Sequence, residues 1–210
     1  MSDLTRDSRY SRQVMIRRIT ASGLLTAMAV VLMYMEVSLP LMPAFLKFDF
    51  SEVPVLIGAF SIGPVYGVIV ELLKNLIHLP ATGTEGIGEM SNFITGSLYV
   101  FTAGLIYQKH RTRKGAVVAM LVGTAVLALI SAPFNYFVTL PLYGSVLGFP
   151  MQAIIGMCNA ANSHVHDKTD VILMVFVPFN LFKGLLVAFI TFWVYKPISR
   201  LINQTYEKTH

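Results

Sequence analysis

The sequence has 210 residues, of which 55% are hydrophobic and only 13% are charged. Soluble domains carry about 25% charged residues, so this composition excludes an ordinary soluble domain and indicates a membrane protein. The formal net charge of +5 is typical of basic cytoplasmic loops in a membrane protein, and no nucleic-acid partner is expected. No Ser/Gly-rich or charge-rich linker divides the chain, so residues 1–210 are expected to form one domain.

The apolar segments, taken in chain order, predict membrane-spanning helices. The first runs over about residues 19–36 and lacks a small-residue cleavage pattern, so it is interpreted as an uncleaved span rather than a signal peptide. Residues 51–78 hold a long apolar stretch interrupted at Gly63 and Pro64, which predicts either one tilted helix or two short helices joined by a turn. Three more segments, 93–107, 116–140 and 170–195, follow, and most of the segments are long enough to cross a ~30 Å hydrocarbon core.

The basic residues decide between these alternatives, because Lys and Arg near span ends gather on the cytoplasmic side. If residues 51–78 cross once, the cluster at 109–114 lies opposite the N-terminal tail, whereas two crossings bring all basic clusters to one side. We therefore predict an all-α integral membrane protein with six transmembrane helices and both termini cytoplasmic, in which the second and third helices are short and tilted or shielded by protein. The clusters are Arg6, Arg9, Arg12, Arg17 and Arg18 in the tail of about residues 1–18; Lys109, Arg111, Arg113 and Lys114; and Lys196, Arg200 and Lys208 in the tail of about residues 196–210.

Polar side chains within three of these helices are predicted to lie at the same depth, in the outer half of the bundle. Lys74 lies about one turn from the outer end of the third helix, and Asn135 lies near the outer end of the fifth. Asn180 and Lys183, spaced i and i+3, share one face of the sixth helix. Ionisable residues inside a membrane are by default candidates for a functional site, so these side chains predict a pocket open to the outside.

The triplet Pro-Phe-Asn occurs twice, at 133–135 and 178–180. Proline frees backbone groups in a membrane helix, and such irregular backbone is tolerated where it is buried in protein or lines a cavity. The alternative interpretation is that Asn135 and Asn180 only join helices by hydrogen bonds. In that alternative Lys74 and Lys183 pair with Glu71 or extend outward to the interface.

Two outer loops are predicted to cover the pocket. Residues 37–52 form an apolar loop with two prolines, interpreted as a lid with Lys47 and Asp49 at its edge. The Gly-rich loop at 81–92 lacks the GxxxxGK[ST] phosphate-binding pattern, so it is interpreted as a flexible gate with Glu89 and Asn92 near its hinge.

Catalytic and metal-binding motifs are missing from the sequence. There is no HExxH, GxSxG, Walker A or paired His/Cys ligand set, and Cys158 is the only cysteine, which leaves the redox compartment open. A protein that moves solute uphill without an ATPase motif must draw energy from an ion gradient or from another subunit. Gly23 and Ala27 form a small-xxx-small pair on the first helix that could let a partner helix approach closely, and Gly63 and Gly67 form a second such pair.

Four separated segments carry a family resemblance. They are LMPAFLKFDFSEVPVLIGAFSIGPVYGVIVELLKNL (41–76), SNF (91–93) after the Gly-rich loop, NYFVTLPLYG (135–144) and VPFNLFKG (177–184). Together, and in this order, they resemble the riboflavin-specific substrate-binding subunit, or S component, of energy-coupling factor (ECF) vitamin transporters. The resemblance covers nearly the whole chain, but the loop at 145–170 and the N-terminal tail carry little of it.

The resemblance implies a six-helix bundle in a prokaryotic plasma membrane that binds riboflavin as a transported ligand, with no cofactor. It also implies a transmembrane coupling subunit and two cytoplasmic ATPases as partners, and reorientation in the membrane to release the vitamin inside. Gly23 and Ala27 match the family's docking face, with Gly23 replacing the more usual alanine. Asn135, Asn180 and Lys183 match its polar ligand contacts.

Aromatic residues near these positions are candidates for the apolar walls of the pocket. Residues 46–49 match the family segment that closes over the flavin, and Lys74 and Asn92 are carried over as further contacts. The candidate substrate-binding residues are Leu46, Lys47, Phe48, Asp49, Lys74, Asn92, Phe134, Asn135, Tyr136, Phe179, Asn180 and Lys183.

Two other functions stay open at this point. One is an S component for another heteroaromatic vitamin. The other is a self-sufficient ion-coupled transporter with Glu71 and Lys74 as its coupling pair. A membrane enzyme would need a nucleophile or metal set that the sequence lacks.

Overall fold

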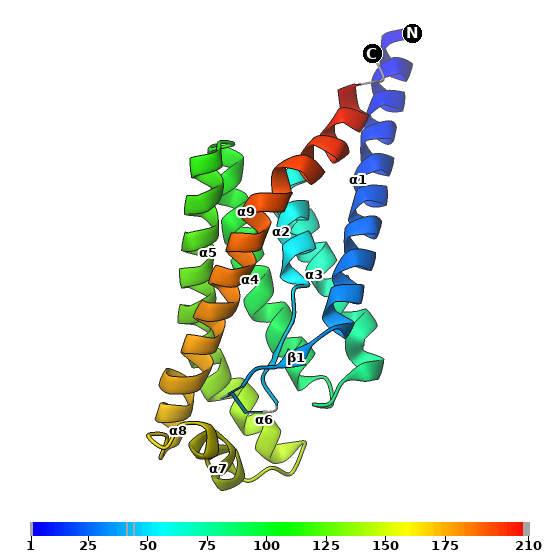
Figure 1. Ribbon diagram of the computed structural model, residues 1–210. Coiled ribbons are helices and arrows are strands. Elements are labelled where there is room, and N and C mark those ends of the chain that lie inside the picture. Colours follow the sequence, from blue (N-terminus) through cyan, green and yellow to red (C-terminus); the bar gives the residue numbers. More distant parts are fainter. Residues whose placement is uncertain (1, 41, 44, 208–210) are drawn as a thin grey trace.

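Helices make up nearly all of the regular structure in the computed structural model, which describes residues 2–40, 42–43 and 45–207, with side chains described over 12–198 and at 202 within those limits. Of the predicted basic residues, the side chains of Arg6, Arg9 and Arg200 and the whole of Lys208 lie outside this part. The helices that run along the bundle are α1 (Ser2–Tyr34), α2 (Glu52–Ser61), α3 (Pro64–His78), α4 (Ile87–Lys109), α5 (Arg113–Phe134) and α9 (Val177–Glu207) (Figure 1).

Shorter elements gather at one end of the bundle. After α5 the chain continues through the π-helix η2 (Asn135–Thr139) into α6 (Leu140–Ser145), and α7 (Met151–Ala161) follows. Helix α8 (Lys168–Asp170) and the π-helix η3 (Val171–Phe176) lead into α9, while the 3-10 helix η1 (Leu79–Ala81) follows α3. Strands β1 (Val37–Ser38) and β2 (Lys47–Phe48) pair antiparallel in the segment between α1 and α2. The long helices therefore form a scaffold with these short elements at the end opposite the α4–α5 turn.

The apolar stretch at 51–78 folds as two helices. The chain breaks at Gly63, whose φ of 139° favours glycine, and Pro64 takes the first position of α3, where its missing N–H costs no helical hydrogen bond. Helix α2 has 10 residues, or about 15 Å at 1.5 Å per residue, which is half of a hydrocarbon core. Its residues from Glu52 to Phe60 are buried, so α2 is shielded by the surrounding helices. The two-helix alternative is confirmed and the single tilted helix is wrong.

In the part of the chain that the structure describes, three helical segments are long and apolar enough to cross a membrane: Arg12–Tyr34, Arg113–Ser145 and Lys168–Ile198. The start of α1, the α4–α5 turn and the end of α9 point toward the same end of the bundle, where a topology with six crossings requires them (Figure 1). The helical membrane fold is confirmed, while the number of crossings and the cytoplasmic side of the termini remain predictions.

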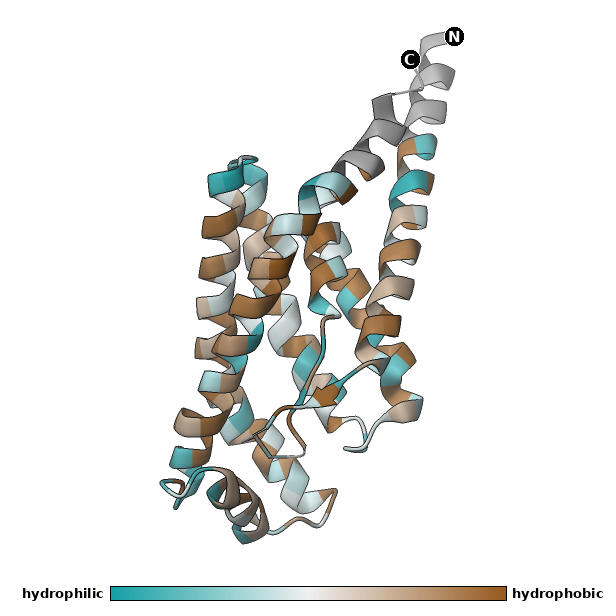
Figure 2. Cartoon of the chain, viewed as in Figure 1, coloured by the Kyte–Doolittle hydropathy of each residue, from teal (hydrophilic) through white to brown (hydrophobic). Residues whose placement is uncertain are grey.

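Apolar residues are abundant along the helices of the bundle (Figure 2). Many of their side chains are exposed on its surface, among them Leu129, Phe189 and Trp193, which are at least 63% exposed. Inside, one apolar cluster lies toward the end that holds the chain termini and includes the stacked rings of Phe60 and Tyr107, with centroids 4.4 Å apart. A second cluster lies among the short elements. Buried charged side chains lie in α2, α3, α4 and α9 and in the segment preceding α2.

The two small-residue pairs differ in their surroundings. A Cβ atom at Gly67 would lie 2.7 Å from Val100 Cγ1 and 2.8 Å from Ala59 Cβ, so this glycine lets α3 pack closely against α2 and α4. A Cβ atom at Gly23 would meet nothing within 4 Å, and Gly23 and Ala27 are both exposed. The pair of Gly63 and Gly67 thus serves internal packing, whereas the pair of Gly23 and Ala27 leaves a free surface on α1.

Candidate substrate-binding site

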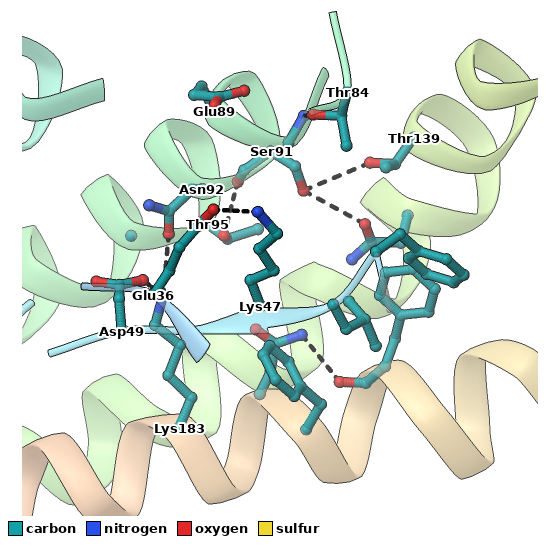
Figure 3. A pocket seen from close by; sticks show the side chains of 18 of the residues that line it. Glu36, Lys47, Asp49, Thr84, Glu89, Ser91, Asn92, Thr95, Thr139 and Lys183 are labelled. Carbon is teal, nitrogen blue, oxygen red and sulfur yellow. Dashed lines mark hydrogen bonds and ion pairs between the residues drawn. The ribbon is translucent and has the colours of Figure 1, made fainter. Parts of the chain in front are cut away.

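A cavity of about 380 Å³ lies at the end of the bundle that holds the short elements (Figure 3). Its size falls within the ~300–1,000 Å³ range of small-molecule sites. The walls come from the end of α1, the β2 segment, the first turns of α4, the η2–α6 region and the start of α9. The predicted lid and the predicted gate both contribute lining residues, so a cavity does lie where the sequence placed one.

Lys183 links three parts of this cavity. Its ammonium group lies 3.1 Å from Asp49 Oδ2, and it donates to Asn92 Oδ1 at 3.3 Å (Figure 3). The Asn92 amide in turn donates to Asn75 Oδ1 at 3.2 Å. Lys183 is only 7% exposed, so its charge is compensated by a carboxylate from the loop before α2 rather than by water. The contact ties α9 to that loop and to α4.

Asp49 is held in its charged form. Burial by itself raises the pKa of this carboxyl group, but the charges of Lys183 and Lys74 and hydrogen bonds from Ser51 outweigh burial and lower the pKa to about 2. The anchor for Lys183 therefore stays ionised at neutral pH.

A second buried lysine lies beneath the cavity rather than on its wall. Lys74 is fully buried, and its ammonium group lies 2.7 Å from Glu52 Oε1 and 2.8 Å from Glu71 Oε2. Ser51 accepts a further hydrogen bond from it at 2.8 Å. The pairing of Lys74 with Glu71, offered above as an alternative, is confirmed. Of these groups only Glu52 reaches the cavity, so the Lys74 network supports the floor of the site.

Both Pro-Phe-Asn motifs adjoin π-helices, which occur often at functional sites. Asn135 begins η2, and the second motif starts two residues after the end of η3. Each asparagine amide donates to the carbonyl four residues earlier: Asn135 to Ser131 at 2.7 Å and Asn180 to Phe176 at 2.9 Å. Both asparagines line the cavity, so two amides from antiparallel helices reach the same space.

The predicted substrate-binding residues divide into two groups. Those that line the cavity are Leu46, Lys47, Asp49, Asn92, Asn135, Phe179, Asn180 and Lys183. Phe48, Lys74, Phe134 and Tyr136 do not belong to the lining. Phe48 packs against Phe50 and Phe182, and Tyr136 lies beneath Lys168, whose Nζ is 3.9 Å from the ring centroid.

The structure adds lining residues that sequence reasoning missed. The main additions are Glu36, Phe45, Ser91, Thr139, Tyr143 and Phe176. Ser91 donates to Asn135 Oδ1 at 3.3 Å, which connects α4 to the first motif. Phe45, Ser91, Thr139 and Tyr143 fall within the segments that carry the family resemblance. That position is the signal in the sequence that pointed to them.

Two further carboxylates, those of Glu36 and Glu89, line the cavity. Glu36 forms an ion pair with Lys47 across the β1–β2 segment. Glu89, on α4, lies 2.9 Å from His78 Nδ1 and accepts a hydrogen bond from Thr82 at 2.8 Å. The Gly-rich loop is thus held to α3 and α4 by side-chain hydrogen bonds.

Comparisons with known proteins agree with this architecture. Residues 17–195 match the family described as the ECF transporter, substrate-specific component. The chain is 30% identical over 188 residues to the riboflavin transporter RibU of Staphylococcus aureus, covering 90% of this chain and 93% of that protein. It is 29% identical over 192 residues to the riboflavin transporter FmnP of Bacillus subtilis, covering 90% and 95%.

A solved structure shares the fold at comparable identity. It is described as the S component of a bacterial ECF transporter, and it superposes with a TM-score of 0.72 at 29% identity, covering 90% of this chain and 98% of the other. The match to the family extends from the middle of α1 to Tyr195 in α9. The chain therefore belongs to the family of substrate-specific components of ECF transporters, which are membrane transport proteins and not enzymes.

Proposed function

We propose that this protein is the riboflavin-binding subunit of an ATP-driven vitamin importer. The observation that carries the proposal is the convergence of the Asn135 and Asn180 amides and the Lys183 ammonium group on one cavity. Riboflavin has a pyrimidine edge with alternating donors and acceptors and an apolar dimethylbenzene end. An asparagine amide offers both a donor and an acceptor, and a lysine donates to a carbonyl. Two relatives named as riboflavin transporters support this choice of vitamin.

The apolar part of the ligand finds a matching surface in the same cavity. Phe176, Phe179, Asn180 and Lys183 follow the i, i+3, i+4, i+7 spacing of one helix face. The aromatic residues and the polar residues at the end of η3 and the start of α9 therefore face the ligand together. Tyr143 from α6 and Phe45 from the loop, with ring centroids 5.7 Å apart, extend this apolar wall.

Energy for uptake comes, in this proposal, from partner subunits, because members of the family work with an ATPase module. The partners are a transmembrane coupling subunit and two cytoplasmic ATPases. The exposed Gly23 and Ala27 on α1 offer the coupling subunit a helix surface that it can approach closely. The protein itself supplies the binding site.

Removal of either amide tests the proposed pocket. Asn135→Ala or Asn180→Ala is expected to weaken riboflavin binding by about 1–3 kcal/mol, because a buried partner group on the ligand loses its hydrogen bond. Quenching of riboflavin fluorescence by the purified protein measures the affinity. Asn162→Ala is the matched control, since Asn162 lies outside the cavity lining. Wild-type affinity in both cavity variants would remove the basis of the proposal.

A bulky side chain on the free face of α1 tests the docking surface. Gly23→Leu is expected to leave riboflavin binding unchanged and to reduce uptake of radiolabelled riboflavin by cells. Gly156→Leu is the control, because Gly156 is an equally open glycine in α7. Loss of binding in Gly23→Leu would assign Gly23 to the fold, and normal uptake would exclude this face as the docking surface.

A further inference from the structure

Five buried charged side chains are joined by ion pairs beneath and beside the cavity, and together they form the buried charge cluster. Asp49, Glu52 and Glu71 contribute carboxyl groups, and Lys74 and Lys183 contribute ammonium groups. Each of the five residues is at most 7% exposed. If all five were ionised, three negative charges would face two positive charges. The cluster would then bury one negative charge without a counter-charge, which is costly in a protein interior.

The helices packed around α2 and α3 supply no further positive charge to this cluster. Residues 19–33 of α1 have no titratable side chain, and residues 90–106 of α4 have only one tyrosine, which is neutral at pH 7. Residues 177–194 of α9 have only the lysine already counted. His78 on α3 pairs with Glu89 on α4 outside the cluster. The excess negative charge therefore has to be balanced within the cluster itself.

The two glutamates of the cluster lie close together around one ammonium group. Lys74 Nζ is 2.7 Å from Glu52 Oε1 and 2.8 Å from Glu71 Oε2. A Cβ atom at Gly96 would lie 2.7 Å from Glu71 Oε1 and 3.1 Å from Glu52 Oε1, so both carboxyl groups lie against the same point of α4. Two carboxyl groups that share one site disfavour the ionisation of both. A single lysine balances only one of them.

The hydrogen bonds of this pair leave two oxygen atoms open. Asn75 donates to Glu71 Oε1 at 2.9 Å, and Lys74 donates to Glu52 Oε1. The second oxygens, Glu52 Oε2 and Glu71 Oε2, are buried and accept no hydrogen bond from the described residues. A proton can occupy such an oxygen atom. A bound Ca²⁺ or Mg²⁺ would instead need about six or more oxygen ligands, and here N–H donors of a lysine and an asparagine surround the carboxyl groups.

From this geometry we propose that Glu52 and Glu71 together hold one proton at neutral pH, so that the pair shares a single negative charge with Lys74 and the buried charge cluster is neutral. The proton belongs to the folded state, because Glu71 and Lys74 are fully buried and lie outside the cavity lining. The two carboxyl groups titrate together, so the proton is assigned to the pair. Both glutamates are ionised in the unfolded chain at neutral pH, so the folded state binds one proton more and stability falls as the pH rises.

The melting temperature of the detergent-purified full chain between about pH 6 and about pH 8 tests for this proton. A proton that only the folded state holds makes the unfolding equilibrium constant rise about tenfold per pH unit, so the wild type is expected to melt at a lower temperature as the pH rises. Glu52→Gln and Glu71→Gln each leave one carboxylate for Lys74 and need no proton. Each variant is therefore expected to lose this slope.

Glu85→Gln is the control for these variants, because Glu85 is exposed and lies in the Gly-rich loop outside the cluster. It is expected to keep the slope of the wild type. The same slope in the wild type and in all three variants would overturn the inference. A saturable rise of the wild-type melting temperature when sodium chloride or calcium chloride replaces an organic-cation salt would assign the balancing charge to a metal ion and would also overturn it.

Infrared spectroscopy in an ester-free detergent gives a second measurement that does not depend on unfolding. The C=O stretching band of a protonated carboxyl group is separate from the bands of a carboxylate. This band is expected in the wild type and in Glu85→Gln at pH 7, and it is expected to be absent from Glu52→Gln and Glu71→Gln. A wild-type spectrum without the band, or a band that persists in both cluster variants, would contradict the proposed proton.

Discussion

Lys183→Met is expected to weaken riboflavin binding by about 2–5 kcal/mol, the range found when one partner of a buried charge pair is removed. The variant loses the proposed donor to the ligand. It also leaves the Asp49 carboxylate, which is 5% exposed, without the ion pair that joins the loop to α9. Titration of the purified variant with riboflavin, followed by fluorescence quenching, measures the loss.

A second variant separates these two effects. Asp49→Asn combined with Lys183→Met removes both charges, so no buried carboxylate remains unpaired. We expect this double variant to recover the thermal stability of the wild type without recovering binding. Recovery of binding would mean that Lys183 acts only by holding Asp49, and wild-type affinity in Lys183→Met alone would contradict a role for Lys183 in the site.

Lys74→Met is expected to lower the free energy of unfolding by about 3–5 kcal/mol, because breaking a buried ion pair leaves a charge that nothing compensates. Here two carboxylates lose their shared partner, and the side chains of Glu52 and Glu71 are 3% and 0% exposed. Thermal unfolding of the detergent-purified variant, followed by tryptophan fluorescence or by light scattering, measures the change.

Lys109→Met provides the control for Lys74→Met, since Lys109 is exposed in the last turn of α4. A further variant, Glu52→Gln with Glu71→Gln and Lys74→Met, neutralises the whole network and is expected to regain part of the lost stability. Equal melting temperatures for Lys74→Met and Lys109→Met would contradict the network as a source of stability.

The sequence predicted the parts of the site that depend on local pattern. The two Pro-Phe-Asn motifs located Asn135 and Asn180 on the cavity wall, and the i, i+3 spacing located Lys183 beside Asn180. The pair Gly63 and Pro64 indicated the break between α2 and α3. Each of these features follows from backbone chemistry within a few residues, so each could be derived without tertiary structure.

The aromatic residues show where local reasoning reaches its limit. Phe134, Asn135 and Tyr136 are consecutive, and successive residues on a helix point about 100° apart, so the three side chains cannot all face one cavity. Asn135 takes that position, and the lining resumes four residues later at Thr139. Phe48 does not line the cavity for the equivalent reason in a strand. It lies between Lys47 and Asp49, which line the cavity, and successive side chains of a strand point to opposite sides.

The sequence could not predict which charged residues far apart along the chain pair with each other. The partnership of Glu52 with Lys74 joins residues 22 positions apart, and it exists only because α2 and α3 fold back on each other at Gly63. The contact between Asp49 and Lys183 joins residues 134 positions apart. Charges inside a membrane protein indicate that partners exist, but the identity of those partners depends on how the helices pack.

The most direct test of the proposed function is purification of the full chain in detergent without added vitamin, followed by an absorbance spectrum and mass spectrometry of the ligand released on denaturation. The account predicts a yellow protein that carries stoichiometric riboflavin. A colourless preparation that also fails to quench added riboflavin would contradict it.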